Sequence, residues 1–267
     1  MKERKQTRSH ETTVELDADQ AAVWKALTDP AELVRWFPTI ARATPGAGGN
    51  LHLAWDEDFV GDCPIRIWEP PHRLVIGWME GGNHRPPGPL AVEFLLATRG
   101  AQTILRIVHS GFGTTDQWQD EYDGTSRGWM QESGSLALYL ERHRQKDRTL
   151  AWARVPVTGS DEHLWPRLLG PDGFIVAPDP TSLHSGDPFA AVIGGKDRVS
   201  GTVDFSAPPR DFSGILDSHS GALFRLAIET AFGQKEAIIW FSMWGHGHER
   251  AREFVARWKR DLAARFR

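Results

Sequence analysis

Residues 126–144, SRGWMQESGSLALYLERHR, form the stretch that decides how the first half of the chain folds. Four residues recur at intervals of three or four and so share one face of a helix: Trp129, Ser133, Leu136 and Leu140. Basic residues occupy the last turn, where positive charge interacts favourably with the helix dipole. The pattern therefore predicts a long helix that ends near Arg144 and lays an apolar face on another layer of structure.

Short runs with the alternation typical of strands precede this helix. They lie at residues 13–16, 51–55, 64–68, 73–79, 90–97 and 102–109. Turn signals separate the runs, among them Glu69-Pro70-Pro71-His72 and Arg99-Gly100, and short connections favour antiparallel pairing. We therefore expect an antiparallel sheet of about six strands.

Two short helices are expected between the first strand and the rest of the sheet. Asp17 can cap the first helix, and Asp29 with Pro30 begins the second, which carries Trp36 and Phe37. Helices on one side of an antiparallel sheet make an α+β fold. A long helix laid across a curved sheet leaves a space between them, and the short helices can close one end of it.

The second half of the chain echoes the first in the same order. Trp165 follows Trp24 at an offset of 141 residues, Pro208-Pro209-Arg210 follows Pro70-Pro71-His72 at 138, and Gly233-Gln234-Lys235 follows Gly100-Ala101-Gln102 at 133. A final helix places Ala251, Phe254, Val255, Trp258, Leu262 and Phe266 on one face. We interpret residues 147–267 as a degenerate second copy of a domain formed by residues 1–146. Pro166 predicts that the first helix of this copy begins only near Trp165.

Five groups of residues in the first half carry a family resemblance. They are VWKALTDP at 23–30, LVRWF at 33–37, EPPHRLV at 69–75 leading to Trp78, VHSGF at 108–112, and Gly128-Trp129 with Leu136 and Tyr139-Leu140-Glu141. In this order, across residues 12–142, they resemble the helix-grip (SRPBCC or START-like) superfamily of lipid carriers, polyketide cyclases and plant pollen-allergen proteins. The most similar member is the AHSA-type domain shared with the ATPase activators of the ninety-kilodalton heat-shock chaperone.

The resemblance implies tandem helix-grip units, each a curved antiparallel sheet wrapped around a long C-terminal helix. In the first unit it also implies an apolar cavity between the sheet and the helix. Similar proteins include ligand carriers, cyclases and chaperone cofactors, so the fold by itself implies no single activity.

Strand alternation indicates which side chains face the space under the long helix. Taken with the residues of the helices, the predicted ligand-binding set is Trp36, Phe37, Trp55, Ile67, Trp78, Phe94, Ile107, His109, Phe112 and Trp129. The direction of Trp78 stays open, because both alternations of its strand are apolar. Aromatic walls with few polar groups are typical of a small-molecule site. The alternative is that these rings are simply core.

His109 is the one ionisable residue that alternation sends inward. A histidine there can orient a carbonyl or hydroxyl of a ligand, or act as an acid or base near neutral pH. The alternative is a buried histidine that bonds only to its neighbours. The sequence positions no carboxylate to orient His109, so no catalytic residue is assigned.

Composition argues against several classes of protein. The 267 residues carry 31 Lys and Arg against 35 Asp and Glu, a net charge of −4 that lacks the basic excess of nucleic-acid binding. No apolar run approaches the roughly 20 residues of a membrane span, and none follows the basic N-terminus as a secretory signal would. The single cysteine, Cys63, fits a reducing compartment, and we expect a cytoplasmic protein.

Neither a cofactor nor a metal site is expected. The sequence has no glycine-rich phosphate loop. The acidic run Asp56-Glu57-Asp58 with Asp62 lacks the spacing of a calcium loop, and we expect it to lie at the solvent-exposed tip of a hairpin. His246-Gly247-His248-Glu249 has no cysteine nearby to complete a metal site, and Cys63 has no neighbouring histidine to activate it as a nucleophile.

These observations support three hypotheses for function. The first is non-catalytic binding of an apolar or aromatic small molecule in the N-terminal unit. The second is a cyclase- or hydrolase-like enzyme, which requires a second polar group about 3 Å from His109. The third is a chaperone-cofactor-like module that binds a protein partner through a large exposed apolar patch.

Overall fold

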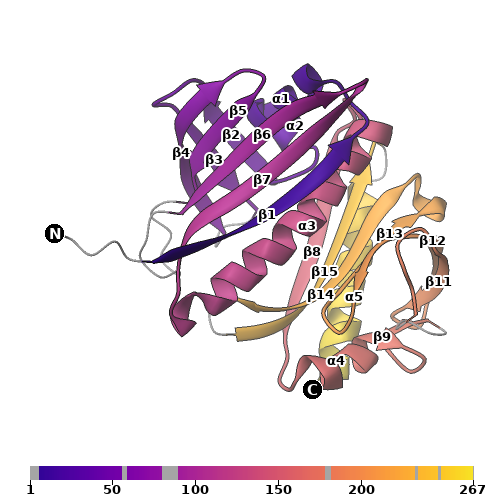
Figure 1. Cartoon of the computed structure of the whole chain (residues 1–267). Coiled ribbons are helices and arrows are strands. Elements are labelled where there is room, and N and C mark those ends of the chain that lie inside the picture. Colours follow the sequence, from indigo (N-terminus) through magenta and orange to yellow (C-terminus); the bar gives the residue numbers. More distant parts are fainter. Residues whose placement is uncertain are drawn as a thin grey trace. The chain divides into compact units, whose positions relative to one another are not determined.

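The computed structural model describes residues 6–55, 59–79, 90–177, 182–231, 234–245 and 248–266. The chain divides into two compact units, Met1–Lys146 and Asp147–Arg267 (Figure 1). None of the described helices is long and apolar enough to cross a membrane.

The first unit is an antiparallel sheet with one long helix. Its elements are β1 (Thr7–Leu16), α1 (Gln20–Thr28), α2 (Pro30–Leu33), β2 (Ile40–Thr44), β3 (Asn50–Ala54), β4 (Val60–Glu69), β5 (Arg73–Gly77), β6 (Ala91–Arg99), β7 (Gln102–Gly113), a 3-10 turn (Asp116–Trp118) and α3 (Gln119–Arg142). The strand order is β1-β7-β6-β5-β4-β3-β2, and every neighbouring pair is antiparallel. The long helix α3 packs along β1 and β7 (Figure 1).

Aspartates cap both short helices. The side chain of Asp29 accepts from Ala31 N at 2.9 Å, as expected for α2. The prediction for α1 is wrong by two residues, because Asp19 rather than Asp17 is the cap and accepts from Ala22 N at 2.8 Å. Helix α2 is also shorter than expected and ends before Trp36, which lies in the following turn and donates Nε1–H to Ala26 O.

Two features of the first unit, strand β2 and the beginning of helix α3, were not predicted from the sequence. Strand β2 was not predicted, because IARAT contains one large apolar residue and forms by pairing its backbone with β3 at the edge of the sheet. Helix α3 begins at Gln119, seven residues before Ser126. Gly124 and Gly128 weaken the helical pattern there, and packing on the sheet supplies what local preference does not.

The second unit repeats the same plan. Its elements are β8 (Arg148–Pro156), α4 (Asp161–Leu168), β9 (Leu169–Gly170), β10 (Ile175–Val176), β11 (Pro188–Ile193), β12 (Asp197–Ala207), β13 (Asp211–Leu216), a 3-10 turn (Asp217–His219), β14 (Ala222–Ala231), β15 (Gln234–Trp244) and α5 (His248–Arg265). The order is β8-β15-β14-β13-β12-β11-β10-β9, in which β9 and β10 are the one parallel pair of this sheet. Helix α5 packs on β8 and β15.

The α+β class and the tandem helix-grip plan are thus confirmed, and strand register aligns the two copies. The Pro–Pro hairpins, β4–β5 and β12–β13, correspond at the expected offset of 138. The last hairpin pairs Arg99 with Gln102 in one unit and Ala231 with Gln234 in the other. The offset there is 132, so the predicted 133 is wrong by one residue.

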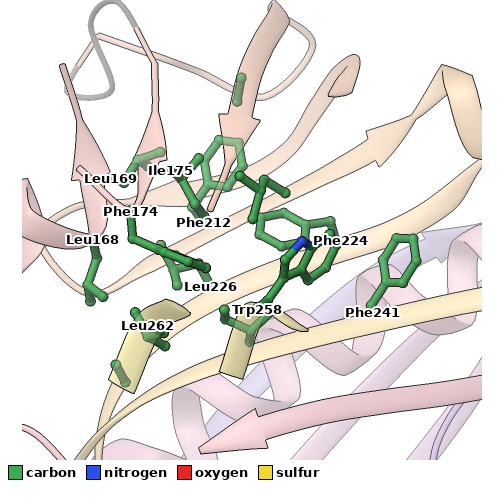
Figure 2. Close-up of a cluster of buried hydrophobic side chains, with 14 of the residues drawn as sticks. Leu168, Leu169, Phe174, Ile175, Phe212, Phe224, Leu226, Phe241, Trp258 and Leu262 are labelled. Carbon is green, nitrogen blue, oxygen red and sulfur yellow. The ribbon is translucent and has the colours of Figure 1, made fainter. Parts of the chain in front are cut away.

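The interior of the second unit is an apolar core between the sheet and α5. Figure 2 shows Phe224, Phe241 and Trp258 side by side in it, and all three are fully buried. The prediction for α4 is wrong, since the helix begins at Asp161 and contains Pro166. Ser160 caps it by accepting from His163 N, and a helix of eight residues tolerates the one hydrogen bond that Pro166 cannot make.

Candidate functional site

The inner face of the first sheet, the face covered by α3, carries the alternation that the sequence indicates. On β7, Leu105, Ile107 and His109 are fully buried while Arg106 is exposed. On β1 the inward row ends at Leu16, and it includes His10, which pairs directly with His109. Two histidines on neighbouring strands therefore lie on this face.

An aromatic cluster surrounds Phe37 in the first unit. The ring of Phe37 stacks on Trp36, Trp78 and Trp129, with centroids 4.8, 6.3 and 5.4 Å away. Trp55 meets it edge-on at 4.9 Å. The rings come from the turn after α2, the ends of β3 and β5, and α3, so segments far apart in sequence meet at one place. All five rings are buried, and each of the other four contacts Phe37.

Trp129 joins the aromatic cluster to His109. Its ring meets Phe94 edge-on at 5.6 Å, and its Nε1–H donates to His109 Nδ1 at 3.2 Å. An indole nitrogen only donates, so Nδ1 of His109 is the acceptor and carries no proton. In neutral His109 the proton is therefore on Nε2.

His10 has a hydrogen bond of its own to α3. Its Nε2 lies 3.0 Å from Thr125 Oγ1, and that hydroxyl donates to Glu121 O at 2.7 Å. Since the hydroxyl has a single proton, it accepts from His10 Nε2–H. Burial lowers the pKa of His10 to about 4, so the ring is neutral at pH 7.

The His10 ring contacts three other rings. The His10 ring lies 5.3 Å from the rings of both His109 and Phe112, and 5.2 Å from the Tyr122 ring. Phe112 stays on the inner face because Gly111 forms a bulge with a φ of +98°, a conformation that favours glycine. Around the histidine pair, the inner face of the sheet thus combines aromatic rings with two neutral imidazoles.

The structure brings together nine of the ten predicted site residues on the buried side of the first unit. They are Trp36, Phe37, Trp55, Trp78, Phe94, Ile107, His109, Phe112 and Trp129. The open direction of Trp78 is resolved, since its ring lies 5.4 Å from both His109 and Trp129. A role for these residues in binding stays a prediction.

The prediction that Ile67 faces inward is wrong. A bulge shifts the register of β4, so that Ile65 pairs with Ile76 while Ile67 pairs with Val75. Ile67 is therefore half-buried in the row of Val75 and Glu93 on the opposite face. One extra residue in a strand reverses the alternation beyond it, and no residue type in the sequence marked the position.

Sequence reasoning missed His10, Thr125 and Tyr122. The predicted first strand covered only residues 13–16, whereas β1 begins at Thr7. Counting back in twos from the buried Leu16 reaches His10 on the inner face, so alternation was the available signal. Thr125 and Tyr122 lie in the part of α3 that the helical pattern did not include.

A second polar cluster fastens the other end of α3. The hydroxyl of Tyr139 donates to the carboxylate of Glu32, which also lies 3.1 Å from Arg35 Nη1. Burial, followed by the hydrogen bond to Glu32, raises the pKa of Tyr139. These groups connect α2 to α3 and lie outside the aromatic cluster, so we assign them a structural role.

The described residues hold no group of three or more His, Cys, Asp or Glu side chains arranged to bind a metal ion. Asp56-Glu57-Asp58 and His246-Gly247 lie outside the described residues. Asp62 accepts from Asn50 and lies 3.0 Å from His52 Nδ1 on an exposed face. Cys63 is buried, and Met79 N donates to its sulfur at 3.4 Å.

An open hollow of about 590 Å³ lies at the edge of the second sheet. Its lining is mostly small and apolar and comprises Pro171, Val176, Ala177, Ala190, Ala191, Val192, Arg198, Val199 and Ser200. None of the predicted site residues lines it.

Comparisons with known proteins agree with the architecture of the first unit. Residues 17–141 match the family model described as Activator of Hsp90 ATPase homolog 1-like protein. No protein with a curated description matches the chain.

Three solved structures illustrate the range of similar chains. CalU16 from Micromonospora echinospora is 28% identical over 51% of this chain and 77% of its own, with a TM-score of 0.42. DynU16, from the dynemicin biosynthetic locus, is 17% identical over 97% of this chain and 96% of its own, with a TM-score of 0.45. The di-domain ARO/CYC BexL from the BE-7585A biosynthetic pathway is 12% identical over the same shares, with a TM-score of 0.45. The match of the family model over residues 17–141, together with the strand order, supports an AHSA-type domain of the helix-grip superfamily in the N-terminal unit.

Proposed function

We propose that the N-terminal unit binds an apolar or aromatic small molecule among the rings of the aromatic cluster, without catalysing a reaction. The ligand contacts are the nine inward residues named above, with His109 as a polar group at the inner end. An AHSA-type domain fits either ligand binding or protein interaction, and the chemistry of the inner face favours the ligand.

The observation that carries this proposal is a difference between the two units. Strand register places Phe241 at the position of His109 and Ala151 at the position of His10. The second unit therefore builds the same strand pair with an apolar core. Since the fold does not need imidazoles there, the histidines of the first unit serve another purpose, and contact with a ligand accounts for them.

A ligand that enters the aromatic cluster must separate rings that pack on Phe37. A stacked or edge-on aromatic pair contributes about 0.5–1.5 kcal/mol beyond the area it buries. A flat ligand that inserts between Phe37 and a neighbouring ring replaces one or two such pairs with contacts of its own. Binding therefore requires that the apolar area buried by the ligand outweigh the cost of moving the packed rings apart.

Calorimetric titration with naphthalene tests the proposal. We expect saturable binding of one molecule per chain, weakened about tenfold by Trp129→Leu, because Trp129 contacts Phe37, Trp78 and Phe94. Trp68→Phe is the matched control, since Trp68 packs on Trp24 instead. Absence of saturable binding, or equal weakening by both variants when both remain folded, would refute the proposal.

An enzyme that uses His109 is the second candidate. Its requirement for a second polar group is met by the Trp129 indole at 3.2 Å. That indole, however, engages the Nδ1 lone pair, the atom that a general base would use. Ligand binding therefore ranks first, and proton exchange at the α-carbon of a bound ketone, followed by NMR, would reverse the order.

A protein-interaction module is the third candidate. Among the described residues, the exposed large apolar side chains are Ile40, Val60, Met130 and Val176. In the first sheet, Ile40 and Val60 flank the buried Ala54 on neighbouring strands, which makes only a small patch. A few scattered apolar side chains are normal for a protein surface, so this candidate ranks last.

A further inference from the structure

We propose that His10 determines which aromatic ligands the first unit accepts, by taking a hydrogen bond from a hydroxyl group on an otherwise uncharged ring system. This inference rests on the proposed function and names the class of ligand for the same site. The aromatic cluster would hold the ring system, and His10 would select its polar substituent.

The hydrogen bonds of His10 leave one nitrogen with acceptor capacity. Nε2–H is used by Thr125, so neutral His10 has an unprotonated Nδ1. Among the described residues, the bond to Thr125 is the one hydrogen bond that the His10 side chain makes. The imidazole therefore offers an acceptor and no second donor, which matches a hydroxyl group and not an ether or a carbonyl.

Thr125 does not require His10. The threonine hydroxyl already donates to Glu121 O at 2.7 Å, within its own helix. The second unit has Ala151 at the position of His10, so the strand pair also forms without an imidazole. The bond to Thr125 orients the His10 ring and fixes its tautomer, which is what a residue that reads a ligand needs.

The charges around His10 favour a neutral ligand. His109 from β7 carries no proton on Nδ1, because that atom accepts from Trp129. Tyr122 from α3 contributes a phenol that donates to Ser9 O. Arg8 is the nearby cation on β1, but its guanidinium lies over the Tyr122 ring at 4.0 Å and its Nη1 donates to Gln119. A positive charge committed in this way is poorly placed to pair with an anion at His10.

Four naphthalene probes separate these possibilities: naphthalene, 1-naphthol, 1-methoxynaphthalene and 1-naphthoate, titrated calorimetrically into the full chain at pH 7. We expect 1-naphthol to bind about 5–10-fold more tightly than 1-methoxynaphthalene, the effect of one hydrogen bond to a partly buried acceptor. In His10→Leu the two affinities should become equal, while naphthalene binds within about twofold of its wild-type affinity.

Two further variants make the experiment decisive. Thr12→Val changes the next inward residue of β1 and should keep the preference for 1-naphthol. His10→Ala, which copies Ala151 of the second unit, replaces His10→Leu if circular dichroism shows that His10→Leu does not fold.

The outcomes distinguish the two proposals. If naphthalene binds but the preference for 1-naphthol is absent, or survives loss of His10, the role of His10 is refuted and the proposed function stands. If 1-naphthoate binds most tightly, the polar group is read by Arg8 and the role of His10 is again refuted. If no probe binds, the proposed function fails and this inference fails with it.

Discussion

The two units share a strand order, apart from the additional strand β9 in the second, but they differ in what they bury against the long helix. In the first unit, α3 brings Trp129 onto His109, and the indole N–H bonds to the imidazole. In the second unit, α5 brings Trp258 onto Phe241 with ring centroids 5.4 Å apart, and the indole N–H bonds to Asp197 Oδ2 at 2.7 Å. A tryptophan thus fills the same role in both units, while its polar atom is used differently.

The difference separates features that the fold requires from features that we propose serve a site. A sheet of this order needs apolar contacts with its helix, and the second unit supplies them with a filled core (Figure 2). The first unit supplies them with broad rings around a histidine pair. Function resides in such substitutions on a common framework, and the predictions below test this separation.

The largest expected effect is the loss of Trp258 from the filled core of the second unit. Trp258→Ala removes contacts with Phe224 and Phe241 and leaves a cavity, so the free energy of unfolding should fall by about 4 kcal/mol. Denaturant titration measures the loss. Lys259→Ala, at the exposed neighbouring position, is the control and should change stability by less than about 0.5 kcal/mol. A small effect of Trp258→Ala would mean that this core is not tightly packed.

An exchange of residues at the equivalent position comes next. Phe241→His replaces a fully buried member of the apolar core by a polar imidazole, and we expect a loss of about 3 kcal/mol. His109→Phe leaves the Trp129 N–H without its acceptor but gains apolar burial, and should cost about 1 kcal/mol. Denaturant titration compares the two. Equal losses would contradict the expectation that position 109 accepts histidine or phenylalanine more readily than position 241 does.

The pH dependence of stability tests the buried state of His10. Its pKa is about 4 in the folded chain and 6.5 in the unfolded chain, so the unfolded state binds more protons between these values. Stability should therefore fall as the pH falls from 6.5 to 4, by about 2 kcal/mol after allowing for partial exposure of the ring. Subtracting the profile of His10→Leu from that of the wild type isolates this contribution. Parallel profiles would show that His10 is not desolvated.

The smallest expected effect concerns the polar cluster of Glu32, Arg35 and Tyr139, which connects α2 to α3. Tyr139→Phe removes the phenol that donates to Glu32 and accepts from Gln145 N, while Arg35 continues to pair with Glu32. We expect a loss of about 1 kcal/mol in the free energy of unfolding and no change in naphthalene affinity. Tyr122→Phe, which removes an exposed bond to Ser9 O, is the stability control. Weaker naphthalene binding in Tyr139→Phe would show that this end of α3 belongs to the site.

Much of the fold followed from local patterns. The face of Trp129, Leu136 and Leu140, the turn prolines and the alternation around His109 were sufficient for the α+β class and the tandem plan. The errors fall where contacts outside a segment set its structure. Strand β2 depends on pairing with β3, the start of α3 depends on packing, and the direction of Ile67 depends on a bulge.

The sequence by itself determined which residues are available at the candidate site: broad rings and a histidine with the spacing of buried strand positions. Only the tertiary structure decided that Trp129 donates to His109 and that His10 lies beside it. The reason is physical, since periodicity specifies the face on which a side chain lies. Hydrogen-bond partners, tautomers and desolvation depend on distances between different segments, some of them as far apart in the sequence as His10 and Thr125.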